Sequence, residues 1–300
     1  MTVLITGATG LVGKAIVAQC AKKDIAVHFL TTSKNKVENQ AHYKGFYWNP
    51  AKGEIDIACF EGVDAIINLA GASISKRWTS SYKKTILESR ISSLNLLREC
   101  ISENNFTIKH LISASAIGIY PDSLTRYYDE DVKEVSPSFL GTVTEQWEAA
   151  ADAFSELGME VAKIRIGLVL DHKEGALPKL VQPVRYGMGA TFGDGSQWQS
   201  WIHVKDLARL FLFVLINKES GIFNGVAPNP VTNKEMLHII AKDLHKPLIM
   251  PNIPKSFMKL ALGDMHQLLF ESQLVGSKKV EALGFSFKYP KLEMALRDLL

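Results

Sequence analysis

The sequence is poor in cysteine, and its cysteines lack any metal-binding or redox spacing. The 300 residues include three, Cys20, Cys59 and Cys100, with no CxxC pair. The number is odd and each cysteine lies in an apolar or helical stretch, which argues against a disulfide framework. The 8 histidines are dispersed, with neither HExxH nor a Cys/His cluster, so no metal site is expected. We expect buried thiols and a reducing, cytoplasmic environment.

Long apolar runs and clustered charge are also missing. The longest apolar run, residues 210–216, is far shorter than the roughly 20 residues of a membrane helix. Residues 1–4 lack the basic start of a signal peptide and give way at once to glycines. The net charge is +3, and lysines form only short pairs such as Lys22-Lys23 instead of a basic stripe. We therefore expect neither a membrane nor a nucleic acid as a partner.

The first half of the chain alternates short apolar runs with helical patterns. With 47% hydrophobic and 22% charged residues, the composition is that of an ordinary globular protein, which excludes disordered, collagen-like and coiled-coil classes. The repeated strand–helix units predict an α/β fold, a doubly wound parallel sheet with helices on both faces. The predicted strands are 2–6, 26–31, 65–70, 110–115 and 161–170, and the predicted helices are 11–22, 80–103 and 142–157.

The pattern changes after residue 170. Residues 171–199 are rich in Gly and Pro, and prolines punctuate the chain after residue 226. Helices are predicted over 204–217 and near 232–244 and 255–269, and a strand over 221–226. The change in composition predicts a nucleotide-binding domain over 1–225, with 171–200 contributing to the substrate side. A small C-terminal cap over 226–300 completes that side.

A glycine-rich turn separates the first predicted strand from the first predicted helix. In this context the first glycine permits the tight turn, the second lets a pyrophosphate approach the backbone, and the third lets helix and strand pack closely. The helix N-terminus stabilises the phosphate charge. The alternative is a plain strand-to-helix turn. The sequence GxxGxxG predicts these cofactor-binding residues: Gly7, Thr9, Gly10, Leu11, Val12 and Gly13.

The end of the second predicted strand bears on the choice of cofactor. An NAD site usually places a carboxylate here to bind the ribose 2′-hydroxyl, but no acidic residue follows before position 38. Thr31, Thr32 and Ser33, followed by Lys34, offer hydroxyl and ammonium groups that suit a 2′-phosphate. We therefore predict NADP(H) rather than NAD. The alternative is that these are solvated loop residues.

The GxxGxxG spacing resembles the extended, epimerase-like branch of the short-chain dehydrogenase/reductase superfamily, which has a Rossmann fold. Segments along essentially the whole chain are similar to its "epimerase family" proteins, whose members are named by similarity more than by activity. These segments are Lys76-Arg77-Trp78-Thr79, Glu88-Ser89-Arg90, 113–120, Gln146-Trp147-Glu148, 200–207, 224–233, 262–265, 272–273 and 284–290.

The resemblance implies further cofactor contacts. Leu69, Ala70 and Gly71, at the end of a predicted buried strand, match the segment that lies against the adenosine and ribose. Arg90 is implied to face the cofactor, where a guanidinium binds phosphate or ribose oxygens. The alternative for Arg90 is an exposed helical arginine paired with Glu88 or another nearby acid.

The catalytic pair that the resemblance implies is absent. In the superfamily a Tyr acts as general acid/base, a Lys four residues later lowers its pKa, and a Ser or Thr orients the substrate oxygen. None of the 8 tyrosines of this chain has a lysine four residues after it. When Glu148 is aligned with the acid that often follows the pair, Leu140 and Thr144 occupy the two positions. Leu140 cannot transfer a proton, and Thr144 cannot lower the pKa of a phenol.

Three other residues are the predicted catalytic candidates. Ser113 and Ser115 lie at the C-terminal end of a predicted strand, the edge where α/β sheets hold their ligands, and Tyr120 follows. Ser115 is expected to hydrogen-bond a substrate carbonyl, and Tyr120 to act as a displaced acid. The alternatives are that the serines satisfy the strand end and that Tyr120 packs against Pro121.

Two functions fit these observations. One is an NADP(H)-dependent oxidoreductase or epimerase-like enzyme acting on a small carbonyl or sugar-nucleotide substrate. The other is a catalytically weak or inactive dinucleotide-binding sensor or scaffold. The missing YxxxK favours the second, whereas the serines and the C-terminal region favour the first. In both cases we expect a small-molecule ligand and a monomer or homodimer.

Overall fold

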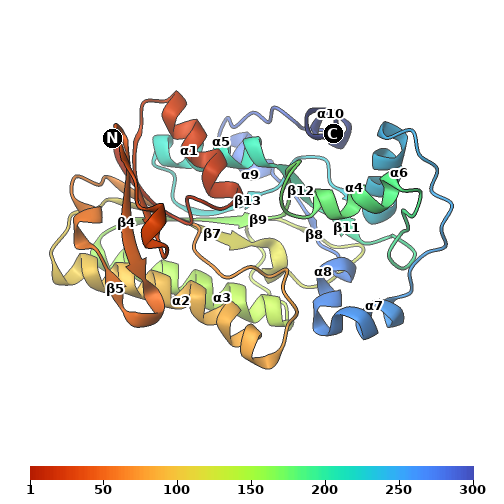
Figure 1. The fold of residues 1–300 in the computed structure, drawn as a ribbon, viewed down its shortest axis with the longest axis horizontal. Coiled ribbons are helices and arrows are strands. Elements are labelled where there is room, and N and C mark those ends of the chain that lie inside the picture. Colours follow the sequence, from red (N-terminus) through yellow and green to blue (C-terminus); the bar gives the residue numbers. More distant parts are fainter.

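Parallel strands form the centre of a nine-stranded sheet. The computed structural model describes all residues, 1–300. The parallel strands lie in the order β13-β9-β7-β6-β1-β2-β4, and β3 and β5 pair antiparallel with β4. The chain moves outward from β1 first to one side and then to the other, which confirms the predicted doubly wound fold (Figure 1). The bounds are β1 Thr2–Thr6, β2 Ala26–Thr31, β3 Asn39–Gln40, β4 Tyr43–Asn49, β5 Glu54–Ile55, β6 Ala65–Asn68, β7 His110–Ala116, β9 Glu160–Ile166 and β13 Gly221–Gly225.

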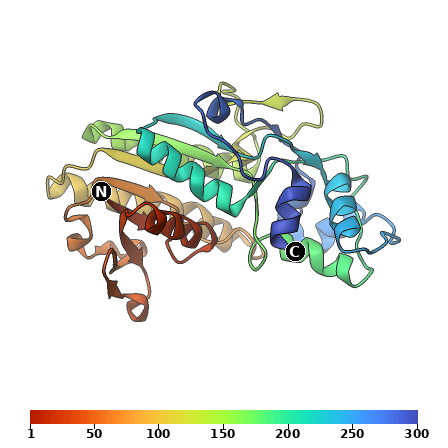
Figure 2. The ribbon, with the colours of Figure 1, turned by 90° about the horizontal axis from the view of Figure 1, so that it is seen from above.

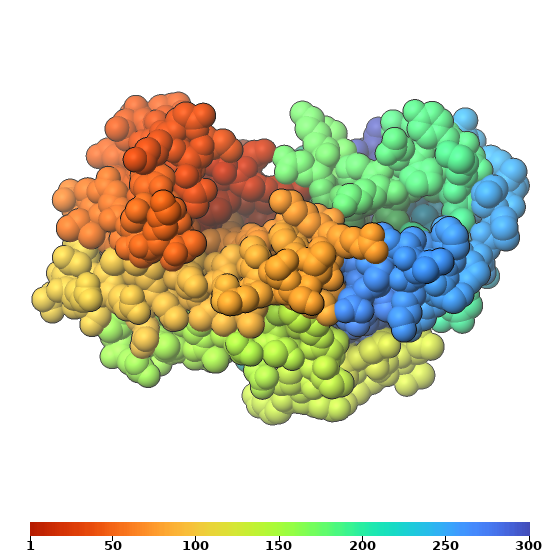
Figure 3. Space-filling model, turned by 60° about the horizontal axis from the view of Figure 1, so that its bottom comes forward, coloured from red at the N-terminus to blue at the C-terminus, as the bar shows by residue number.

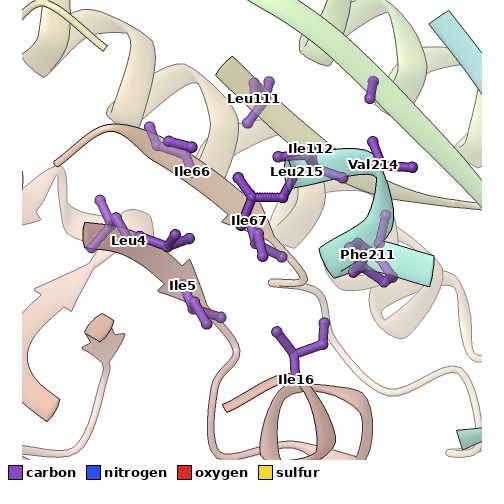
Figure 4. Packing of buried hydrophobic residues seen from close by; sticks show 14 of the residues in the cluster. Leu4, Ile5, Ile16, Ile66, Ile67, Leu111, Ile112, Phe211, Val214 and Leu215 are labelled. Atoms are coloured by element: carbon purple, nitrogen blue, oxygen red, sulfur yellow. The ribbon is translucent and has the colours of Figure 1, made fainter. Parts of the chain in front are cut away.

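Helices cover both faces of this sheet. α1 (Leu11–Lys22) and α5 (Val204–Asn217) lie on one face, and α2 (Ser80–Glu103) and α3 (Phe139–Asp152) lie on the other (Figures 1 and 2). Strand residues alternate between the faces: Ile5 and Ile67 point toward Ile16 of α1, whereas Ile66 points away (Figure 4). These residues belong to a core of 43 buried residues. Each fully buried aliphatic side chain of this kind stabilises the fold by about 1.5–3 kcal/mol.

A second core of 15 buried residues lies beyond the C-terminal ends of the strands (Figure 2). It joins the segment after β9 to the C-terminal part of the chain, because β11 pairs with β14 and α6 packs between α4 and α10. Val280 and Phe285, however, return to the large core. The bounds are β10 Leu168–Leu170, α4 Leu177–Arg185, β11 Trp198–Gln199, β12 Trp201–His203, β14 Val231–Thr232, α6 Asn233–Asp243, α9 Lys278–Ala282 and α10 Leu292–Leu299. The domain boundary near residue 226 stays a prediction.

One C-terminal segment reaches back to the helices of the other face. α7 (Lys255–Leu262) and α8 (Gln267–Phe270) are separated by a short 3-10 turn, in which Asp264 pairs with Lys83 of α2 (2.5 Å). Met265 and Leu268 pack against the cluster around Trp78. Figure 3 shows this blue segment in contact with the orange start of α2. The C-terminal part therefore touches the α2–α3 layer as well as the sheet edge.

Several element predictions need correction. The helix predicted near 255–269 is α7, the 3-10 turn and α8, because Gly263 has a positive φ (+59°) that interrupts the helix. The strand predicted over 161–170 is broken at Gly167 into β9 and β10. The helix predicted to start at Thr142 begins at Phe139, where Ser138 accepts a capping bond from the Gly141 N–H (3.2 Å). β4, α4 and α10 were absent from the predicted elements.

Candidate active site

The glycine turn is closely packed everywhere except at Gly10. Gly7 has a left-handed backbone (φ +70°), and its carbonyl accepts a hydrogen bond from the Gly10 N–H (3.0 Å). A Cβ on Gly13 would lie 2.2 Å from the same carbonyl oxygen, so the packing of helix on turn requires glycine there. A Cβ on Gly10 would meet only that oxygen, at 3.3 Å. No contact within the chain therefore requires glycine at position 10, and the space beside it is open to a ligand.

The N-terminus of α1 is free to receive an anion. Gly10 is the N-cap and makes no side-chain capping bond, and the first turn of the helix holds no acidic residue. Thr9 and Gly10 are exposed, and Leu11 and Val12 are partly exposed. The first N–H groups of a helix have no partner within it and attract phosphate. The turn therefore has the geometry and the charge that a pyrophosphate needs.

The hydroxyl of Thr6 connects this turn to the loop after β6. Its oxygen accepts hydrogen bonds from the N–H groups of Leu69 and Ala70 (both 3.0 Å), and its O–H group donates to Asn68 Oδ1 (2.8 Å). A Cβ on Gly7 would lie 3.1 Å from the Leu69 carbonyl oxygen, so the two loops are adjacent. They lie between β1 and β6, where the strand order reverses and where doubly wound sheets bind dinucleotides. Gly71 is exposed beside them.

The polar residues at the end of β2 form a turn without an acidic side chain. Thr31 is buried, and its hydroxyl accepts a hydrogen bond from the Ser33 N–H (3.2 Å). The Ser33 hydroxyl donates to Asn35, and Thr32 is exposed. Lys34 lies over the ring of Tyr47, 4.9 Å from its centroid. The polar side chains of residues 31–35 are thus hydroxyl groups, one ammonium group and the Asn35 amide, with no carboxylate.

Arg90 of α2 is a partly buried cation without a carboxylate partner. Its guanidinium donates to the carbonyls of Ile86 (2.7 Å) and Ala72 (3.3 Å) and lies over Trp147, 4.9 Å from the ring centroid. Burial lowers the pKa of Arg90 to about 10, which still leaves it charged at neutral pH. The alternative pairing with Glu88 is not formed, because Glu88 faces Lys84 (3.5 Å). A Cβ on Gly71 would lie 3.0 Å from the guanidinium carbon, so Arg90 borders the loop after β6.

Arg90 also lines a cavity of about 190 Å³ at the C-terminal ends of β7 and β9. α3 supplies Leu140, Thr144 and Trp147 to its wall, and α8 with the residue that follows it supplies Gln267 and Glu271. Leu140 and Thr144 thus lie at the ligand side of the helix, where the missing Tyr and Lys were aligned. Two buried polar atoms at this wall, Trp147 Nε1 and Gln267 Oε1, have no hydrogen-bond partner in the chain. Such atoms are rare in proteins unless a ligand or water meets them.

The structure places the three predicted catalytic residues outside this cavity. Ser113 is fully buried, donates to the Ala114 carbonyl (3.0 Å) and accepts from Asn68 Nδ2 (3.2 Å). The Ser115 hydroxyl donates to Glu148 Oε1 (2.5 Å). Tyr120 is also fully buried, and its hydroxyl donates to Asn224 Oδ1 (2.8 Å). This geometry favours the structural alternative for the serines and packing for Tyr120.

A buried ion pair between Arg165 and Glu148 occupies the hydroxyl groups of Ser115 and Tyr120. Arg165 of β9 donates two hydrogen bonds to Glu148 of α3 (2.8 and 3.0 Å) and a third to the Tyr120 hydroxyl (3.0 Å). Burial opposes ionisation of Glu148, but the bonds and charge of Arg165 outweigh it and lower the pKa of Glu148. Burial raises the pKa of Tyr120 to about 12, despite the nearby Arg165. A phenol of this kind is a poor proton donor near neutral pH.

Sequence patterns did not single out Glu271, the one carboxylate that lines the cavity. It follows α8 and directly precedes residues 272–273, which resemble the epimerase family, but nothing in its own spacing signals an active site. Its place depends on the return of the C-terminal segment to the sheet edge. Only long-range pairing brings that segment there, such as the parallel pairing of β15 (Leu274–Val275) with β8 (Tyr127–Tyr128).

Comparison with known proteins agrees with this architecture. The model of the NAD dependent epimerase/dehydratase family matches residues 3–142 and 167–225, and a domain of unknown function matches residues 253–299. The chain belongs to the NAD dependent epimerase/dehydratase family. An epimerase family protein of Staphylococcus aureus (strain MRSA252) is 39% identical over 298 residues, which cover 99% of this chain and 98% of the relative. The recognition of an epimerase family protein from sequence is therefore confirmed.

Two solved structures are similar over the whole chain. The human epimerase family protein SDR39U1, solved with NADPH, has a TM-score of 0.86 at 28% identity, covering 100% of this chain and 99% of its own. A nucleoside-diphosphate sugar epimerase from Corynebacterium glutamicum has a TM-score of 0.79 at 31% identity, covering 100% of this chain and 58% of its own. Both likenesses extend over the whole of this chain, including its C-terminal part.

Other expectations concern features away from the cavity. All three cysteines are free and buried, as predicted. No group of three or more His, Cys, Asp or Glu side chains is arranged to hold a metal ion. None of the helices combines the length and the apolar character needed to cross a membrane.

The first prediction concerns Tyr120. Tyr120→Phe removes the hydroxyl that bridges Arg165 and Asn224 and leaves their buried polar atoms unsatisfied. We expect it to lower the free energy of unfolding by about 1–3 kcal/mol, measured by urea denaturation. NADPH affinity, measured by fluorescence titration, should change less than about twofold, equivalent to ~0.4 kcal/mol. The exposed Tyr127→Phe is the matched control and should be neutral, and unchanged stability of Tyr120→Phe would contradict the structural role.

Proposed function

We propose that this protein is an NADP(H)-binding oxidoreductase that acts on a small carbonyl compound. The observation that carries the proposal is the continuity between the open glycine turn, the loop after β6 and the Arg90 cavity. Together they offer a path from the strand-order reversal to the ends of β7 and β9. When bound, the nicotinamide cofactor would supply a hydride donor or acceptor at the cavity.

The residues that line this path suit the parts of a dinucleotide. The α1 N-terminus and the space beside Gly10 would receive the pyrophosphate, and Leu69, Ala70 and Gly71 would lie against the adenosine and ribose. Arg90 would bind phosphate or ribose oxygens, since its charge has no partner in the chain. The Thr31–Ser33 hydroxyls and Lys34 support NADP(H) over NAD, and the similar human protein was solved with NADPH.

The size and charge of the cavity support a small carbonyl substrate over a sugar nucleotide. Its volume is about 190 Å³, below the roughly 300–1,000 Å³ of pockets that enclose drug-sized ligands. Arg90 is its only cationic side chain, and we assign that residue to the cofactor. A nucleotide diphosphate would need cations or helix N-termini of its own. The cavity instead combines apolar walls with amide and indole groups, which suit a small neutral molecule.

The alternative is a dinucleotide-binding sensor or scaffold without turnover. It is supported by the missing YxxxK and by the structural engagement of Ser115 and Tyr120. Incubating the NADPH complex with a metabolite extract separates the two functions. We expect loss of absorbance at 340 nm to exceed that of the Gly10→Asp variant, because chemistry requires bound cofactor. Tight NADPH binding with no oxidation above that control would select the sensor.

Gly10 offers a direct test of the cofactor site. Gly10→Asp places a carboxylate beside the proposed pyrophosphate, and we expect NADPH affinity to fall at least about 100-fold, or ~2.7 kcal/mol. The fold should survive, because Gly10 is exposed. Gly13→Ala is the matched comparison and should lower the melting temperature, because its methyl group collides with the Gly7 carbonyl. Parent-like NADPH binding by Gly10→Asp would contradict the site.

Cofactor preference is tested by titrating NADPH and NADH at one ionic strength. We expect NADPH to bind at least about tenfold more tightly, which requires only ~1.4 kcal/mol from phosphate contacts. Ser33→Ala and Lys34→Ala should narrow this ratio while leaving NADH affinity unchanged, because they alter only the 2′-phosphate contacts. Equal affinities of the parent protein for both cofactors would contradict the argument from the missing acid.

A further inference from the structure

The cavity has one side chain that can exchange a proton near neutral pH. Arg90 is too basic, and the Thr144 hydroxyl is committed to the Leu140 carbonyl (2.8 Å). The Ser200 hydroxyl is likewise committed to the Gln273 carbonyl (2.8 Å). The other polar residues of the wall are amides and two indoles, which do not ionise in this range. Glu271 is the remaining group.

The backbone on both sides of Glu271 is held by long-range hydrogen bonds. The Ser272 N–H donates to Asp122 Oδ1 (2.7 Å), and the Ser272 hydroxyl accepts from the Trp198 N–H (3.0 Å). Ser272 is fully buried, and the carbonyl of the next residue, Gln273, accepts a hydrogen bond from the Ser200 hydroxyl. On the other side, the Leu269 carbonyl accepts from Gln197 Nε2 (2.9 Å). Such a framework fixes the position of a side chain more firmly than an ordinary surface loop does.

The charges around Glu271 leave it free to change protonation state. None of the ion pairs of the chain includes it. Burial raises the pKa of Glu271, and the charge of Asp122 adds to this effect. Gln273, Ser138 and the charge of Lys255 act in the opposite direction and are weaker. Arg90 is the only other charged group at the cavity wall. A partly buried, unpaired carboxyl of this kind is suited to general acid/base catalysis.

We propose that Glu271 is the catalytic acid/base of this cavity, in place of the tyrosine that the chain lacks. The inference rests on the proposed NADP(H)-dependent function. In the reducing direction the Glu271 carboxyl gives its proton to the substrate carbonyl oxygen, while the carbonyl carbon receives a hydride from the reduced nicotinamide. The C=O double bond becomes a C–OH, the cofactor is oxidised, and Glu271 is left as a carboxylate. The reverse reaction returns the proton to Glu271.

This role places Glu271 close to the nicotinamide and so predicts a proton linkage that needs no substrate. The oxidised nicotinamide ring is cationic and the reduced ring is neutral. A neighbouring cation lowers the pKa of a carboxyl, so binding of NADP⁺ should release the Glu271 proton, whereas binding of NADPH should not. The release requires that Glu271 be at least partly protonated before binding, which its raised pKa favours in mildly acidic buffer.

Calorimetry in two buffers of different ionisation enthalpy measures this release. In mildly acidic buffer we expect NADP⁺ to release more protons than NADPH from the parent protein. Glu271→Gln, which keeps the shape of the side chain, should abolish the difference while still binding NADPH. Glu271→Asp keeps a titratable carboxyl and should restore part of it. Glu145→Gln, an exposed carboxylate change on α3, is the control and should behave like the parent.

The outcomes separate this inference from the proposed function. Absence of binding heat with both cofactors would contradict the cofactor site itself. Binding with equal proton release for NADP⁺ and NADPH, or a difference that persists in Glu271→Gln, would overturn the role of Glu271. With any carbonyl compound that the parent protein reduces, Glu271→Gln should lower turnover about 100-fold or more, at nearly unchanged NADPH affinity. Full turnover of that variant would overturn the role as well.

Discussion

The buried pair between Glu148 and Arg165 determines which side chains remain available at the ligand edge of the sheet. It joins α3 to β9 and holds Ser115 and Tyr120, which are the polar groups nearest the end of β7. An ion pair removed from water is stable only when its remaining hydrogen-bonding capacity is satisfied, and these two hydroxyl groups satisfy it. The Tyr120 hydroxyl also donates a hydrogen bond to Asn224, which extends this network to β13. The residues that look catalytic in the sequence therefore serve to join strands and helix.

A consequence is that the two sides of the cleft differ in what they offer a ligand. The cofactor side has the backbone N–H groups at the start of α1 and Arg90 of α2, which suit recognition of phosphate and ribose. On its inner wall α3 presents Leu140 and Thr144, which cannot perform acid/base chemistry. The C-terminal segment presents Glu271, held in place by Ser272 and its partners. Binding of cofactor and transfer of protons would then depend on different parts of the chain.

Local patterns were sufficient for most of the sheet and for the glycine turn. α1, α2 and α5 have the predicted bounds, because each carries an apolar stripe with clear limits. β4 was missed, since Tyr43–Asn49 is rich in aromatic and polar residues and lacks the continuous apolar run of the inner strands. The role expected of Tyr120 depended on its distance from a strand end, which does not show where its hydroxyl points. Glu271 could not be found locally, because pairing of residues more than 140 positions apart brings it to the cavity.

The absence of the Tyr–Lys pair therefore does not by itself make the cleft inert. The usual pair places its lysine beside the tyrosine because a phenol must be made more acidic before it can exchange protons near neutral pH. A carboxyl group has the opposite requirement: its pKa must be raised, and partial burial without an ion-pair partner achieves this. α3 carries neither member of the pair, and burial raises the pKa of Tyr120 despite the opposing charge of Arg165. Glu271, in the C-terminal segment that forms the opposite wall of the cavity, would supply the group that exchanges a proton near neutral pH. One buried carboxyl would then replace the Tyr–Lys pair.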